Sequence, residues 1–305
     1  MHRIARFAAR MPVPLLLALA PRGAAAATGE TGFAFLKLGV GARPMGMGSA
    51  YVALAEDPTA VYWNPAGLAD ASGAQLTLMH NEWIQDFRQE FAAVSAPLGG
   101  GALGFGFSGF YTSELERRDD TGTLIGHFGF NDVSVTANYA RRFLERFSGG
   151  LGVKYIREMI DQEDATAVAF DLGGRFQDAK TGLSAGVAAQ NMGGDATFVS
   201  ESFSLPFTLR GGAAWERDIS AWQGRGTMSA EVRKARGEDT RFHVGGEFEY
   251  RQRAALRAGY SAGYDDQDLS FGLGLKHSRL TFDYALVPFS SDLGTTHFFS
   301  LTINL

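Results

Sequence analysis

Residues Leu36 to Leu68 read LKLGVGARPMGMGSAYVALAEDPTAVYWNPAGL, and this stretch lacks the period-2 alternation that fills most of the later chain. Asp57-Pro58 and Asn64-Pro65 each place a helix-capping residue before a proline, which is favoured at the first helical position. The stretch therefore predicts two short helical turns, one from about Pro58 and one from about Pro65, the second ending at Gly67 or just beyond. A compact, irregular segment ahead of a long strand series predicts a plug inside a barrel.

From Ala74 onward, segments with alternating apolar and polar residues recur between turn signals. Leu273 and its neighbours show the pattern: Leu269, Phe271, Leu273 and Leu275 share one face, while Ser270, Gly272, Gly274 and Lys276 share the other. Such faces fit a lipid-exposed wall around a polar interior. About fourteen strands are expected, with cores near 74–83, 87–97, 102–112, 129–142, 150–160, 165–177, 182–191, 205–217, 226–235, 240–251, 254–262, 268–277, 279–287 and 295–305.

A soluble sandwich with one apolar and one polar face shows the same alternation. Three features favour the membrane barrel: an even strand number ending in an amphipathic C-terminal strand, short connections that alternate with longer ones, and aromatic residues near strand ends. The longer connections are 113–127, 192–204 and 288–294, and the aromatic set includes Trp83, Trp215, Tyr250 and Phe289. The predicted fold is all-β: a transmembrane antiparallel barrel of about fourteen strands with an N-terminal luminal plug of short helical turns.

The N-terminus has the features of a secretory signal peptide. Arg3, Arg6 and Arg10 precede an apolar run from Met11 to Ala20, which is too short to span a bilayer, and small residues follow up to Ala27. We expect residues 1–27 to be cleaved, residues 28–73 to form the plug and residues 74–305 to form the barrel. Loss of the leader leaves 24 basic against 33 acidic residues, a net charge near −9, which argues against nucleic acid as a partner.

Two motifs within these segments resemble a known family. Gly41-Ala42-Arg43, Gly46-Met47-Gly48 and Trp63-Asn64-Pro65-Ala66-Gly67-Leu68 resemble the PorV/PorQ family of the wider FadL-like outer-membrane group. Ala189-Gln190-Asn191-Met192-Gly193, followed by Leu205-Pro206-Phe207-Thr208-Leu209-Arg210-Gly211-Gly212, is similar to the mid-barrel signature of that family. The resemblance implies a bacterial outer-membrane barrel with an accessory role in type IX secretion, or transport of the FadL-like kind.

The plug supplies the candidate site residues. Its motif, with either a structural or a gating role, comprises Gly41, Arg43, Gly46, Gly48, Asn64, Pro65, Ala66 and Gly67. Met45, Met47, Tyr51 and Trp63 form a candidate apolar pocket, although they could equally pack against the inner wall. Charged residues on the polar strand faces must point into the lumen, because they are costly in hydrocarbon.

The residues give no support for enzymatic activity, a cofactor or a metal site. The six histidines show no metal-ligand spacing. Gly104-x-Gly106-x-x-Gly109 matches a dinucleotide fingerprint only in its letters, because it lies within an alternating strand instead of a strand-to-helix turn.

Two functions remain open at this point. The first is an accessory or docking protein for protein secretion or surface attachment, whose partners are secretion-system proteins or exported cargo. The second is a FadL-like passive channel for a hydrophobic small ligand. Both place the chain in outer-membrane lipid.

Overall fold

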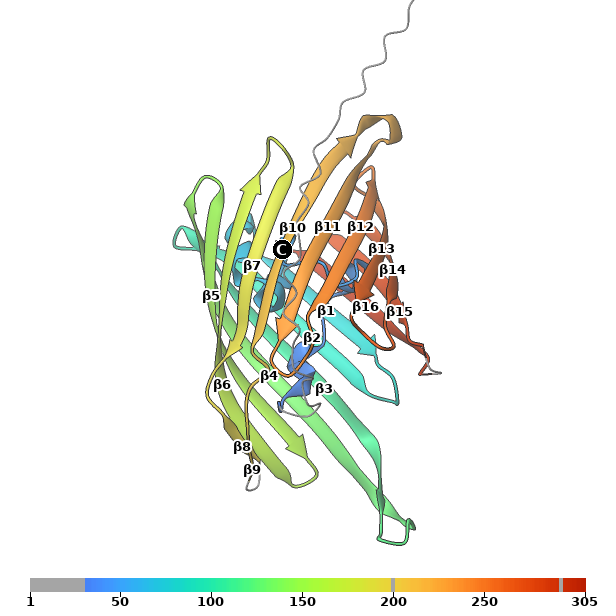
Figure 1. Cartoon of the computed structure of the whole chain (residues 1–305). Helices are drawn as coiled ribbons and strands as arrows, with labels where there is room; N and C mark the ends of the chain where they lie inside the picture. The colour runs from blue at the N-terminus through green and yellow to red at the C-terminus, as the bar shows by residue number, and fades with distance from the viewer. Residues whose placement is uncertain (1–30, 199–200, 291–292) are drawn as a thin grey trace, which may run out of the picture.

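The structure is a computed structural model that describes residues 31–198, 201–290 and 293–305. The predicted signal peptide lies outside the described residues. Fourteen antiparallel strands close into a barrel in the order β1-β16-β15-β14-β13-β12-β11-β10-β7-β6-β5-β4-β3-β2, and β8 and β9 form a separate two-stranded sheet (Figure 1). The predicted fold class is confirmed.

The wall is built from long strands that pair with their neighbours in sequence. Its strands are β1 (Gln75–Glu82), β2 (Arg88–Leu98), β3 (Gly101–Arg118), β4 (Leu124–Leu144), β5 (Phe147–Ile160), β6 (Glu163–Asp178), β7 (Leu183–Met192), β10 (Thr208–Ile219), β11 (Gly224–Ala235), β12 (Arg241–Tyr250), β13 (Ala254–Ala262), β14 (Leu269–His277), β15 (Leu280–Pro288) and β16 (Thr295–Asn304). The small sheet is β8 (Ala196–Phe198) with β9 (Glu201–Phe203), and η3 (Ser220–Trp222) connects β10 to β11.

The two ends of the barrel differ in their connections. One end carries the short turns after β2, β4, β6, β10, β12 and β14, together with the chain's C-terminus. The other end carries the longer connections, including the β8–β9 sheet between β7 and β10, although its β5–β6 turn is also short. Short periplasmic turns and longer external loops are typical of outer-membrane barrels, so the β8–β9 end is extracellular.

The outer face of the wall is apolar, as the alternation predicts. Phe271, Leu273 and Leu275 on β14 are 45%, 51% and 62% exposed, while Ser270 on the other face is 3% exposed. In a bilayer these exposed side chains contact acyl chains, and the polar face turns to the lumen. No helix among the described residues is long and apolar enough to span a membrane.

The expected loop at 113–127 is wrong over most of its length. β3 continues to Arg118 and β4 begins at Leu124, so only a tight turn separates them. A register shift between Thr112 and Leu115 interrupts the alternation, which explains why the period-2 pattern ends early in the sequence. The β3–β4 hairpin consequently extends beyond its neighbours at the extracellular end (Figure 1).

The segment before β1 lies inside the barrel. It contains η1 (Ala34–Lys37), α1 (Ala42–Gly46), α2 (Ala60–Trp63) and η2 (Pro65–Asp70). Asn64 caps η2 by accepting a hydrogen bond from the Ala66 backbone N–H at 3.1 Å, as expected from the Asn-Pro step. The turns η1 and α1 were not predicted, because no capping side chain precedes them.

A charged side chain on the outer face tests the lipid contact. We expect Leu273→Arg on β14 to lower the free energy of unfolding by ~2–4 kcal/mol, because it places a guanidinium near the middle of the hydrocarbon layer. Urea unfolding in phospholipid vesicles measures this change. Leu305→Arg, at the rim, is the control and should cost about 0–1 kcal/mol; equal costs at both positions would contradict the lipid-facing assignment.

Candidate functional site

The plug is held to the wall by buried charged side chains. Arg43 of α1 donates two hydrogen bonds to the Glu247 carboxylate on β12, at 3.0 Å from Nε and 2.8 Å from Nη2. Arg257 on β13 donates to the same carboxylate at 2.5 Å and to Asp283 on β15 at 2.7 Å. Two guanidinium groups therefore alternate with two carboxylates, so each buried charge has an opposite charge beside it.

A second cluster holds the middle of the plug. Glu231 on β11 is 3% exposed and accepts the backbone N–H groups of Tyr51 and Val52 at 2.9 and 2.8 Å. Its other oxygen accepts a hydrogen bond from Arg210 on β10 at 2.6 Å. The Arg210 guanidinium also lies 4.8 Å from the centroid of the Trp63 ring. One carboxylate thus satisfies two plug amides that no regular element supplies with partners.

The periplasmic part of the plug meets the opposite side of the wall. The Asn64 side chain donates to the Val52 carbonyl at 2.9 Å, which joins two turns of the plug. Arg175 on β6 donates to the Ala53 carbonyl at 3.0 Å and forms an ion pair with Asp70 of η2. Arg142 on β4 forms a further ion pair with Asp70. The wall therefore binds the plug from both sides of the lumen.

Gly48 makes a close approach to the wall on β12–β14. Its φ is 62°, its N–H donates to Ser270 at 3.0 Å, and its carbonyl accepts a hydrogen bond from Ser261 at 3.0 Å. The His243 ring nitrogen Nδ1 lies 2.8 Å from the same carbonyl. An added Cβ would lie 2.8 Å from the Tyr260 nitrogen, so glycine is required here for both conformation and space.

Inward-facing glycines of the wall mark where the plug backbone touches it. A Cβ at Gly259 would lie 2.0 Å from the Gly48 nitrogen, and one at Gly186 would lie 2.2 Å from the Val52 carbonyl oxygen. Gly104 and Gly106 face Leu68 and Val61 of the plug, which explains two of the three glycines that mimic a nucleotide motif. Glycines on the polar face of successive strands were the sequence signal for this contact surface, and our sequence interpretation missed it. The same close approach occurs at Gly150, Gly173 and Gly245.

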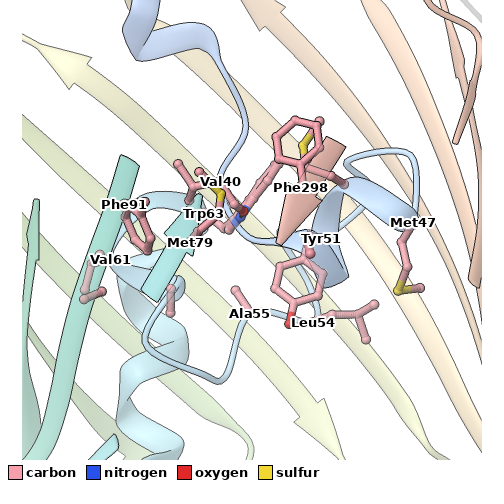
Figure 2. Close-up of a cluster of buried hydrophobic side chains, with 14 of the residues drawn as sticks. Val40, Met47, Tyr51, Leu54, Ala55, Val61, Trp63, Met79, Phe91 and Phe298 are labelled. Atoms are coloured by element: carbon pink, nitrogen blue, oxygen red, sulfur yellow. The ribbon is translucent and has the colours of Figure 1, made fainter. Parts of the chain in front are cut away.

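The four residues of the candidate apolar pocket are all buried. Met45, Met47, Tyr51 and Trp63 are at most 4% exposed and belong to one apolar cluster that extends to the wall. Figure 2 shows this cluster, with Met47 some way from Tyr51 and Trp63. The Trp63 indole N–H donates to the Val40 carbonyl at 2.9 Å, and the Tyr51 and Trp63 rings meet edge to face at 5.9 Å. None of them lines any of the cavities described below, so a ligand pocket at these residues stays a prediction.

The other predicted plug residues lie along the same surface. Gly41 precedes α1, and its N–H approaches the Met79 sulfur of β1 at 2.9 Å. Gly46 lies against β14, where an added Cβ would come 3.0 Å from the Gly272 Cα. Pro65 and Ala66 begin η2 and are buried, and Gly67 packs on the Ala55 carbonyl. The motif thus lies at plug–wall and plug–plug contacts.

The turn η1 and the residue before it, Phe33, form a strap across the extracellular side of the lumen. The Phe33 N–H donates to Glu158 on β5 at 3.0 Å, and Lys37 forms a 2.8 Å ion pair with Glu238 in the β11–β12 turn. Burial raises the pKa of Glu238, but Arg233, Lys37 and Arg241 outweigh it and hold the pKa below its ordinary value. Apolar side chains of η1 pack with those of β5, β6 and β8 in a second cluster: Phe33, Phe35, Leu36, Ile156, Ala165, Ala169, Ala196 and Leu205.

The wall is irregular beside this second cluster. Between the pairs Phe170–Met192 and Leu172–Ala189 the β6–β7 register shifts, and Asn191 adopts φ 58°. The Asn191 N–H donates to Asp171 at 2.7 Å, and Lys154 donates to the Asn191 side chain at 2.7 Å. Beyond this point, within the described residues, β6 pairs only with β5. The mid-barrel motif therefore replaces backbone pairing by side-chain hydrogen bonds.

A polar cavity of about 460 Å³ lies at the periplasmic side of the plug, lined by residues such as Arg43, Glu56, Asp70, Glu216 and Lys276. Two apolar hollows of about 600 and 710 Å³ lie on the outer wall instead of in the lumen, the first over β7 and β10–β14 and the second over β6, β7, β10 and β11. The described residues contain no group of three or more His, Asp or Glu side chains arranged to bind a metal.

Comparison with known proteins supports this architecture. A family model described as "Uncharacterised protein family (UPF0164)" matches residues 20–193. The chain belongs to the UPF0164 family. No curated protein matches it. The plug motif and the first part of the mid-barrel motif both lie within the matched residues.

Solved structures of similar fold include two monoaromatic hydrocarbon channels and a FadL homologue, all of low sequence identity. The TodX deltaS2S3 mutant monoaromatic hydrocarbon channel has a TM-score of 0.64 at 12% identity, covering 88% of this chain and 99% of that one. The CymD monoaromatic hydrocarbon channel has a TM-score of 0.63 at 13% identity, covering 88% and 98%. A Pseudomonas aeruginosa FadL homologue has a TM-score of 0.54 at 13% identity, covering 86% and 97%. The UPF0164 chain therefore has a FadL-like barrel and is an outer-membrane protein.

Proposed function

We propose that this protein is a PorV/PorQ-type docking barrel, in which the plug closes the lumen and the extracellular end binds proteins during secretion or surface attachment. One observation carries the proposal: the polar side chains that a water-filled channel would present to solvent are bonded to the plug. Glu247, Glu231 and Arg175, on three different strands, all bind plug groups. A plug bound in this way favours a structural scaffold over an open pore.

The extracellular end offers the surface that docking requires. The extended β3–β4 hairpin and the β8–β9 sheet stand at this end, beside the η1 strap (Figure 1). We propose that exported cargo or a secretion-system protein binds here. The predicted loop 192–204 contributes the β8–β9 sheet to this surface, and the described residues of 288–294 lie at the same end.

Secretion in the host bacterium tests this proposal. We expect deletion of the gene to remove a defined set of exported proteins from the cell surface and the medium. Replacement of residues 196–203 by a Gly/Ser linker of equal length should reproduce that loss while the barrel stays folded. An equal-length linker at the periplasmic connection 220–223 is the control and should have no effect. Unchanged surface and secreted proteins in the gene deletion would refute the docking function.

A FadL-like passive channel for hydrophobic small molecules is the second candidate. The β6–β7 irregularity beside the apolar side chains of η1 favours it, because fewer backbone hydrogen bonds close the wall there. This candidate predicts uptake of a monoaromatic hydrocarbon by cells that carry the protein, with the uptake lost on deletion of residues 36–68. Equal uptake by cells with and without the wild-type protein would exclude it.

A further inference from the structure

The two ends of the barrel carry opposite unpaired charge. At the periplasmic end, seven exposed cations form no ion pair within the described part of the chain. Six lie at the rim: Arg141, Lys180, Arg217, Arg251, Arg253 and Arg279. The seventh, Lys276, lines the polar cavity. Two acids at this end are already paired, Asp178 with Arg146 and Asp218 with Arg225, and one exposed acid, Glu145, forms no ion pair among the described residues. An excess of cations therefore remains at the periplasmic rim.

The extracellular end has the reverse charge. Nine of its exposed acids form no ion pair over the described ranges: Asp86, Asp119, Asp120, Glu163, Asp195, Glu201, Asp239, Asp265 and Asp268. Two cations at the extracellular ends of β3 and β5 are already paired with nearby acids, Arg117 with Asp161 and Arg157 with Asp164. Three exposed cations at this end, Arg88, Lys234 and Arg236, also form no ion pair among the described residues, but the unpaired acids outnumber them. The excess of unpaired cations is therefore confined to the periplasmic end.

The unpaired cations occur on or beside successive periplasmic turns. Arg141 precedes the β4–β5 turn, Lys180 lies in the β6–β7 turn, and Arg217 precedes the β10–β11 turn. The β12–β13 and β14–β15 turns carry the others. Because these turns follow one another around the closed barrel, the cations surround much of its circumference.

Aromatic side chains fix the depth of this rim in the membrane. The Arg217 guanidinium lies 5.9 Å from the centroid of the Trp215 ring, and that of Arg251 lies 5.1 Å from the Tyr250 ring. Both rings belong to the outer face and are 42% exposed. Exposed Trp and Tyr side chains of this kind occupy the headgroup level of a bilayer. The cations beside them are therefore at the depth of lipid phosphates.

We propose that the periplasmic rim binds the phosphate groups of anionic phospholipids in the inner leaflet of the outer membrane. Each basic side chain near an anionic leaflet gains electrostatic attraction that falls off within a Debye length. The cationic rim anchors the periplasmic end of the barrel at the headgroup layer. The acidic extracellular end is not attracted to anionic lipid. This inference does not depend on the docking or the channel function.

Lipid retention measured by native mass spectrometry tests whether the periplasmic rim binds anionic phospholipid. The intact protein is reconstituted into nanodiscs of phosphatidylcholine containing phosphatidylglycerol, released, and examined for bound lipid. We expect phosphatidylglycerol to be enriched over its share of the bilayer, and the enrichment to fall as salt rises. Changing the six cations to glutamine should abolish it, with each side chain contributing up to about fivefold.

The matched control changes six of the extracellular acids, Asp86, Asp120, Glu163, Glu201, Asp239 and Asp265, to their amides and should leave the enrichment intact. Loss of heat-modifiable migration in gel electrophoresis would show that the six-cation variant does not fold. In that case the enrichment of phosphatidylglycerol on the wild-type protein, and its dependence on salt, still test the proposal. Retention in proportion to bilayer composition would overturn the proposal. So would equal enrichment in both charge variants, or displacement of the lipid by millimolar inorganic phosphate, which would indicate a site for free phosphate.

Discussion

Replacement of Glu231 by glutamine is expected to release the middle of the plug and to lower the free energy of unfolding by about 3–5 kcal/mol. The carboxylate is the partner of Arg210, which is 5% exposed, and it accepts the Tyr51 and Val52 amides. The variant leaves a buried guanidinium without its counter-charge and weakens two hydrogen bonds to the plug. Urea unfolding in vesicles measures the stability, and amide hydrogen exchange at Tyr51 and Val52 measures release of the plug.

Glu249→Gln is the matched control for this change. Glu249 lies on β12 at the edge of the periplasmic cavity and is only partly buried, so its loss should change stability by no more than about 0.5 kcal/mol. If Glu231→Gln left both stability and exchange at their wild-type values, the wall carboxylates would not hold the plug. The support for a closed docking barrel would then be lost.

The second large effect is expected at Gly67, where the two halves of the plug meet. A Cβ on this residue would lie 1.7 Å from the Ala55 carbonyl oxygen, a contact with backbone that no rotamer change relieves. We expect Gly67→Ala to lower the free energy of unfolding by about 1–3 kcal/mol or more through overpacking. The folded barrel should also become sensitive to protease within the plug, measured by limited trypsin digestion in vesicles.

Gly73→Ala provides the control six residues away, because nothing lies within 4 Å of an added Cβ there. It should keep wild-type stability or gain slightly from the lower entropy of the unfolded chain. Equal behaviour of the two variants would show that the close approach of Gly67 to Ala55 does not hold the plug together.

Much of the barrel could be predicted from alternation alone, because each strand residue faces either lipid or lumen with period 2. Leu273 is exposed and Ser270 is buried, as their positions in the sequence predict. The prediction failed where alternation breaks, at the bulge after Thr112 that lengthens β3. Two of the aromatic residues predicted at strand ends, Trp83 and Phe289, pack against the luminal apolar cluster. Both lie in turns, where the alternation of a strand no longer indicates which way a side chain points.

The sequence by itself determined the outer-membrane barrel and the presence of a plug with an Asn-Pro cap, because these depend on local pattern and on residues two positions apart. Only the tertiary structure decided which wall groups bind the plug. Arg43 and Glu247 are 204 positions apart, and Tyr51 meets Glu231 across 180. No local propensity specifies such pairs, since they form only when barrel closure brings distant strands around the same buried segment, where an unpaired charge is too costly to remain.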